Sequence, residues 1–87
     1  MKARFEADGD VIVITGGANG IGRALADAVV SAGARVVVCD VDEKAMAEAE
    51  SANALIATRR LDVGNRDGVM TAFAEIEAEF GRIDGLV

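Results

Sequence analysis

The chain has 87 residues, so it forms at most one domain, and a chain of this length buries a smaller share of its surface than an ordinary enzyme domain does. Nine lysines and arginines against fifteen aspartates and glutamates give a net charge of −6, which excludes the basic surface that nucleic acid binding requires. The single cysteine and the lack of a long apolar stretch exclude a disulfide framework and a membrane span, so we expect a soluble cytoplasmic protein.

Residues 1–10 are polar and acidic and lack the apolar segment of a secretion signal. The β-branched run 11–14 is too short for a helix and predicts a strand that is covered on both faces. A glycine-rich turn follows, and the apolar residues after it, at three- and four-residue spacing, predict a helix that ends near Gly33. The residues expected to face inward from this helix are Ile21, Ala24, Leu25, Ala28, Val29 and Ala32.

The alternation of strand and helix continues along the chain. Residues 35–40 contain a second apolar run, and Asp42 is the expected N-cap of a helix that turns Met46 and Ala49 inward. Residues 54–62 predict a third strand less clearly, because the second half of the segment is polar.

Asn65 is the expected N-cap of a third helix, Gly81 its left-handed stop, and residues 83–87 the start of a fourth strand. The inward residues expected for this helix are Val69, Phe73, Ile76 and Phe80. The sequence therefore predicts an α/β fold, in which residues 1–87 form the N-terminal part of a single Rossmann domain. The expected doubly wound parallel sheet is truncated to βαβαβαβ, with strand order 3-2-1-4 and right-handed crossovers.

The turn between the first strand and the first helix carries glycines at positions 16, 17, 20 and 22. Glycine lets the backbone turn sharply and lets a diphosphate approach without meeting a Cβ atom. Free N–H groups and the positive end of the helix dipole near Ile21 and Gly22 would act on its negative charge. Such a turn can also be a plain connection, but its place between a strand and a helix, with Asp40 ending the next strand, favours dinucleotide binding.

Asp40 can accept hydrogen bonds from both hydroxyls of an adenosine ribose. Its carboxylate would repel a 2′-phosphate, and no lysine or arginine stands at positions 18, 19 or 41 to offset that repulsion. The sequence therefore predicts NAD in preference to NADP. The alternative for Asp40 is a turn or capping role, although Asp42 is better placed to cap.

Asp62 and Val63 end the third strand, at the sheet edge where ligands of open α/β sheets bind. The Asp62 carboxylate can meet the amino group of adenine, or it can bond the backbone of its own loop, and the spacing does not separate the two. Cys39 is expected to be a small buried apolar residue, and no metal ligands are predicted.

Four segments in order resemble the short-chain dehydrogenase/reductase family. Residues 15–22, Thr-Gly-Gly-Ala-Asn-Gly-Ile-Gly, are similar to its T-G-x-x-x-G-x-G turn, and residues 39–42, Cys-Asp-Val-Asp, to its NAD-type acidic strand end. Residues 61–63, Leu-Asp-Val, are similar to its adenine-contacting segment, and residues 84–87, Asp-Gly-Leu-Val, to the start of its D-x-L-V-N-N-A-G strand. The glycine spacing is that of the short single-domain branch.

The resemblance implies reversible hydride transfer between NAD and an alcohol or carbonyl substrate, and assembly into a homo-oligomer. It implies that Asp40 holds the adenosine ribose and that Asp62 with Val63 holds adenine. The residues that it implies for the diphosphate and its ribose are Gly16, Asn19, Gly20, Ile21 and Gly22.

The family's catalytic asparagine, serine, tyrosine and lysine have no counterparts in the matched segments, and the chain contains no tyrosine. We therefore expect the chain to be the cofactor-binding fragment of a longer enzyme, inactive by itself and prone to self-association through exposed apolar surface. Two alternatives stay open: a stand-alone nucleotide-binding or interaction module, and an S-adenosylmethionine-dependent methyltransferase, whose ligand has no diphosphate for the glycine turn.

Overall fold

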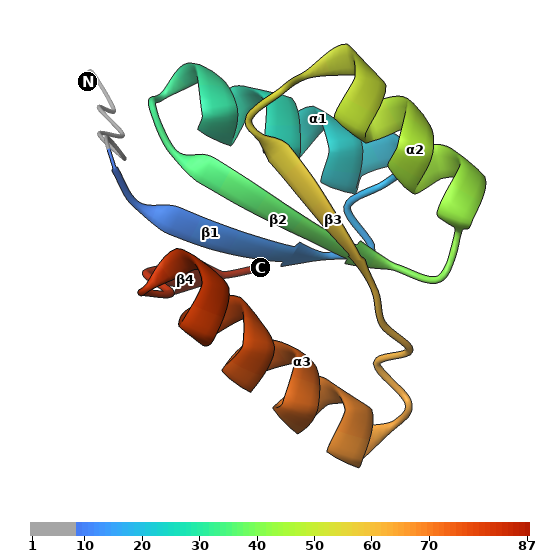
Figure 1. The fold of residues 1–87 in the computed structure, drawn as a ribbon. Helices are drawn as coiled ribbons and strands as arrows, with labels where there is room; N and C mark the ends of the chain where they lie inside the picture. Colours follow the sequence, from blue (N-terminus) through green and yellow to red (C-terminus); the bar gives the residue numbers. More distant parts are fainter. Residues whose placement is uncertain (1–8) are drawn as a thin grey trace.

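The computed structural model describes residues 9–87, so the expectation that residues 1–10 are no secretion signal falls mostly outside the described residues. The described elements form two helical layers around a parallel sheet (Figure 1). In chain order they are β1 (Val11–Thr15), α1 (Gly20–Ser31), β2 (Arg35–Asp40), α2 (Glu43–Ala52), β3 (Ile56–Arg60), α3 (Arg66–Phe80) and β4 (Gly85–Leu86).

The sheet has the strand order β3-β2-β1-β4, and every neighbouring pair is parallel. This confirms the truncated Rossmann-type fold and its strand order. Helices α1 and α2 cover one face of the sheet and α3 covers the other (Figure 1). Because all the strands run the same way, the connections that follow β1, β2 and β3 meet at one edge of the sheet.

The central strands β1 and β2 are buried on both faces, which explains why they are uninterrupted apolar runs in the sequence. Alternate side chains point to opposite layers. Those packed under α1 and α2 are Ile12, Ile14, Val36 and Val38. Those packed under α3 are Val11, Val13, Val37 and Cys39. Burial raises the pKa of the Cys39 thiol, in keeping with its predicted role as a small apolar core residue.

The three predicted helix caps near the sheet edges are confirmed. The Asp42 carboxylate accepts a hydrogen bond from Ala45 N at 3.0 Å, and the Asn65 side chain accepts one from Gly68 N at 3.0 Å. Gly81 ends α3 with a φ of 83°, the left-handed conformation that glycine adopts without steric cost.

The predicted inward face of α1 was partly wrong. Ile21 is 90% exposed, and Ala24 and Ala28 are also exposed. Ala26 and Val30, which the spacing did not select, are buried. The helix is turned so that Ala26, Val29 and Val30 face β1 and β2. Ala28 instead lines an apolar groove between α1 and β4, with Leu25 and Leu86 among its neighbours.

β3 is shorter than the expected 54–62, yet it includes the polar residues that weakened the prediction. The Thr58 hydroxyl donates to Glu50 of α2 at 2.8 Å, and the Arg59 guanidinium pairs with Glu75 and Glu79 of α3 at 3.1 and 2.8 Å. Helices on both faces thus supply carboxylates, so a half-polar edge strand fits between them. β4 is also shorter than the expected 83–87.

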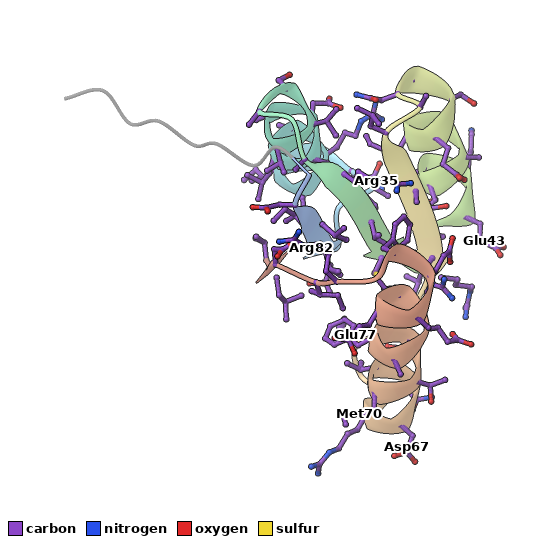
Figure 2. The ribbon with its side chains drawn as sticks, turned by 60° about the vertical axis from the view of Figure 1, so that its left-hand side comes forward. Arg35, Glu43, Asp67, Met70, Glu77 and Arg82 are labelled. Atoms are coloured by element: carbon purple, nitrogen blue, oxygen red, sulfur yellow. The ribbon has the colours of Figure 1, made fainter. Side chains whose placement is uncertain are left out.

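α3 packs through Ile76, which is fully buried as predicted, and through Ala72, which was not predicted. The other predicted residues, Val69, Phe73 and Phe80, are partly buried against the same cluster. Met70 and Asp67 are exposed and lie near the N-terminal end of α3 (Figure 2). Among residues 9–87, no helix is both long and apolar enough to cross a bilayer.

Candidate functional site

The connection from β1 to α1 is a tight glycine turn at the edge of the sheet. Gly16 and Gly20 have φ values of 65° and 57°, and a Cβ atom on either would meet no other atom within 4 Å. A Cβ atom on Gly17 would lie 2.8 Å from Ile14 Cγ2, and one on Gly22 would fall on the carbonyl oxygen of Gly16. Gly16 and Gly20 therefore allow the chain to reverse, whereas Gly17 and Gly22 allow α1 to pack closely against the end of β1.

Asn19 occupies the N-cap position of α1 in an extended conformation, but its side chain makes no capping hydrogen bond. Its Nδ2 atom donates instead to Asp42 Oδ2 at 3.0 Å, across the gap between the first two strand-to-helix connections. The first-turn N–H groups of α1, at Gly20, Ile21 and Gly22, thus receive no side-chain cap from Asn19.

Asp40, at the end of β2, lies beside the glycine turn. Its Oδ1 atom accepts from Val41 N at 2.7 Å and from Asp42 N at 3.2 Å, and its Oδ2 atom accepts from Ala18 N at 3.3 Å. The half-buried carboxylate is therefore held in a fixed orientation between the end of β2 and the turn. The structure brings together the glycine turn and Asp40, which the sequence assigned to one site.

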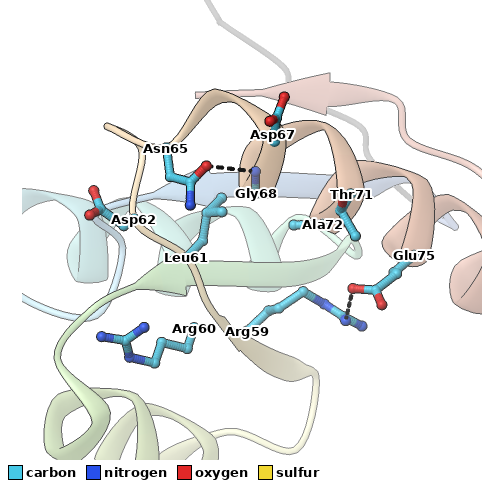
Figure 3. A pocket seen from close by; sticks show the side chains of 10 residues that line it. All are labelled: Arg59, Arg60, Leu61, Asp62, Asn65, Asp67, Gly68, Thr71, Ala72 and Glu75. Atoms are coloured by element: carbon cyan, nitrogen blue, oxygen red, sulfur yellow. Dashed lines mark hydrogen bonds and ion pairs between the residues drawn. The ribbon is translucent and has the colours of Figure 1, made fainter.

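Asp62 lies one strand further from the turn, after β3. Its Oδ1 atom accepts from Gly64 N at 2.9 Å, so the bond to its own loop, one of the two roles left open by the spacing, is present. Its carboxylate is directed away from α3 (Figure 3). Val63 is 65% exposed.

Arg60 is a basic residue near the site that the sequence analysis missed. The parallel pairing of β2 with β3 places it in register with Asp40, and its side chain is exposed. Arg59 reaches toward Glu75, whereas Arg60 points the other way from the strand (Figure 3). Alignment of the ends of the second and third predicted strands would have placed Arg60 beside Asp40, because both strands end at the same edge of the sheet.

A cavity of about 530 Å³ opens between the end of β3 and the first turns of α3 (Figure 3). Arginine, acidic and polar side chains line it, among them Arg59, Asp62, Asn65 and Thr71. Of the predicted site residues, Asp62 alone contributes to its lining. The cavity and the glycine turn are therefore separate features of this sheet edge.

A family model described as short chain dehydrogenase matches residues 10–87. The chain belongs to the short chain dehydrogenase family. It is 35% identical over 83 residues to the short chain dehydrogenase/reductase dpchG of Colletotrichum higginsianum, covering 91% of this chain and 31% of that protein.

Solved structures share the fold of this chain. The crystal structure of gox2181 matches with a TM-score of 0.88 at 33% identity, over 93% of this chain and 33% of that one. A short-chain dehydrogenase/reductase from Burkholderia phymatum, in complex with NAD, matches with a TM-score of 0.85 at 38% identity, over 94% of this chain and 31% of that one. The chain thus spans about a third of the length of the relatives that it matches.

Proposed function

We propose that this chain is the cofactor-binding part of an NAD-dependent oxidoreductase that transfers hydride between NAD and an alcohol or carbonyl substrate. Membership of the dehydrogenase family supports the oxidoreductase and disfavours the methyltransferase alternative. The Burkholderia phymatum relative, solved with NAD, supports a nicotinamide dinucleotide as the cofactor. The observation that carries the proposal is the hydrogen bond from Ala18 N to Asp40, because it fixes a hydroxyl acceptor beside an anion-binding turn.

The glycine turn fits a diphosphate. A Cβ atom on Gly16 or Gly20 would project into open space, so a ligand can approach the backbone there. The uncapped start of α1 offers N–H groups and the positive end of the helix dipole. The residues that we assign to the diphosphate and its ribose are Gly16, Asn19, Gly20, Ile21 and Gly22.

Asp40 fits the adenosine ribose. A carboxylate has roughly four acceptor sites, and the backbone N–H groups of residues 18, 41 and 42 occupy three of them, which leaves capacity for a hydroxyl. We assign adenine to Asp62 and Val63, at the next strand end. The bound nicotinamide would supply the hydride chemistry, while Asp40, Asp62 and Val63 would hold the adenosine half of the dinucleotide.

The charges at this edge favour NAD. A 2′-phosphate would bring a charge of about −2 close to the carboxylate of Asp40, with that of Asp42 nearby. Arg60 is the basic residue nearest in register to Asp40, and its exposed side chain would offset part of that repulsion. We expect the carboxylates of Asp40 and Asp42 to outweigh the positive charge of Arg60.

We further propose that the chemical step belongs to residues outside this chain, so that the chain by itself is inactive. The chain has no tyrosine and no histidine to act as a general acid. Homo-oligomeric assembly and a cytoplasmic location, expected from the sequence, stay predictions.

Calorimetric titration of the full-length protein with NAD and with NADP tests the proposal. We expect tighter binding of NAD, and the double variant Asp40→Ala, Val41→Arg should lose that preference. The variant Arg60→Ala serves as the matched control and should widen the preference, since it removes the positive charge in register with Asp40. Tighter binding of NADP by the unaltered protein would show the cofactor assignment to be wrong.

A further inference from the structure

The N-cap residues of the three described helices behave differently, although all are Asn or Asp. Asp42 caps α2 and Asn65 caps α3, each accepting from a backbone N–H at 3.0 Å. Asn19, at the start of α1, makes no such bond. Asparagine is among the strongest N-cap residues, so an Asn in this position that does not cap requires a competing partner.

That partner is Asp42, whose two carboxylate oxygens have separate tasks. Oδ1 accepts from Ala45 N at 3.0 Å and caps α2, while Oδ2 accepts from Asn19 Nδ2 at 3.0 Å. These bonds, the one from Ala45 N first, lower the pKa of Asp42, in keeping with a carboxylate that accepts both contacts in its ionised form.

We propose that Asp42 is a positioning residue, which holds the Asn19 side chain away from the first turn of α1 and so leaves the N–H groups there free for the coenzyme diphosphate. This inference rests on the proposed function. Without Asp42, the Asn19 side chain can rotate and accept from Ile21 N or Gly22 N, as an ordinary N-cap does. It would then compete with the diphosphate for the same donors.

The variant Asp42→Ser separates the two tasks of Asp42. Serine still caps α2 but is too short to reach Asn19. We expect NAD to bind about fivefold more weakly to the full-length variant, the factor by which one side-chain N-cap shifts an equilibrium. Asp42→Asn is the control for charge: its amide can cap α2 and bond a flipped Asn19 amide, so NAD affinity should stay within about twofold.

A double-mutant cycle separates positioning from a general structural effect. In an Asn19→Ala background no side chain remains to recap α1, so Asp42→Ser should have almost no further effect on NAD affinity. An undiminished effect of Asp42→Ser in that background would overturn the proposal. Equal losses for Asp42→Asn and Asp42→Ser would also overturn it, because the charge rather than the contact would then act.

Hydrogen exchange without coenzyme distinguishes this proposal from the proposed function. If Asn19 recaps the helix, the amides of Ile21 or Gly22 should exchange more slowly in Asp42→Ser than in the unaltered protein. If exchange is slower in Asp42→Ser but the protein does not bind NAD, the positioning of Asn19 by Asp42 stands and the cofactor assignment is wrong. Normal NAD binding, with unchanged exchange and unchanged affinity in Asp42→Ser, would refute the positioning and retain the cofactor.

Discussion

Replacement of Gly22 by alanine gives a sharp test of how the glycine turn is built. The added Cβ atom would fall on the carbonyl oxygen of Gly16 and would lie 2.8 Å from Gly17 Cα. Gly22 does not belong to the glycines with positive φ, so close approach is what requires a glycine there. Both obstacles are backbone atoms, which cannot rotate away as a side chain can.

Two effects of opposite sign decide the outcome. Alanine is favoured over glycine inside a helix by up to about 1 kcal/mol, so helix propensity alone predicts that the variant is more stable. Carbon atoms pack best roughly 3.5 Å or more apart, so the new methyl group would have to move by roughly 0.7 Å against the turn. Overpacking of this kind costs about 1–3 kcal/mol, and a backbone obstacle places it at the upper end. We therefore expect a net loss of about 2 kcal/mol.

Chemical denaturation of the full-length protein measures this loss. The matched control is Gly68→Ala in the first turn of α3, where the new Cβ atom would lie 3.2 Å from Cγ of Asn65 and would meet no backbone atom among its nearest neighbours. The Asn65 side chain would have to move by only a few tenths of an ångström, a shift small enough to keep its capping bond to Gly68 N. That variant should stay within about 1 kcal/mol of the unaltered protein. If Gly22→Ala proved as stable as the unaltered protein, the turn would not be packed as described, and the close approach of α1 to the strand end would be wrong.

Two further predictions concern the packing of the core and the loss of stability at acidic pH. Ile76 is fully buried under the sheet, so Ile76→Ala should lower the free energy of unfolding by about 3 kcal/mol and Ile76→Val by about 1 kcal/mol; similar values for both would mean that α3 is loosely packed. The Asp84 carboxylate accepts from Arg82 Nε at 2.7 Å and from Val11 N at 2.8 Å, and these bonds lower its pKa. A carboxylate whose pKa is lowered in the folded state stabilises the fold above its ordinary pKa, and this stabilisation is lost as the pH falls. The difference in free energy of unfolding between the unaltered protein and Asp84→Asn should therefore shrink below about pH 4. A difference that is constant from pH 7 to pH 3, measured by denaturation, would contradict this.

The parts of the fold that the sequence predicted well are those with short-range causes. The apolar runs of β1 and β2 are buried on both faces, so nothing in their pattern conflicts with a strand. The caps at Asp42 and Asn65 bond N–H groups three residues away, within the reach of a local pattern. The orientation of α1 depends instead on which of its faces meets the sheet, and a helix rich in small apolar residues does not specify that face.

Contacts between elements far apart in the sequence account for most of what the sequence missed. Thr58 and Arg59 are unusual residues for a half-buried strand. Their carboxylate partners come from helices on both sides of the sheet, and the local sequence does not reveal these partners. The sequence does not show that Arg60 is a neighbour of Asp40, because the register between two strands cannot be read from the spacing of residues along the chain. The proposed preference for NAD over NADP therefore involves a residue found through the sheet pairing as well as those found through the motif.

Asn19 shows how far a residue type alone can mislead about a role. Asparagine is a strong N-cap residue, and the backbone of Asn19 has the extended conformation of a cap. The bond to Asp42, 23 positions away in sequence, takes the side chain elsewhere. Asn19 consequently gives the first turn of α1 no side-chain cap, and the N–H groups there stay available to a ligand. If coenzyme-free protein showed the first-turn amides of α1 as protected as those of the capped α2 and α3, this account of the turn would fail.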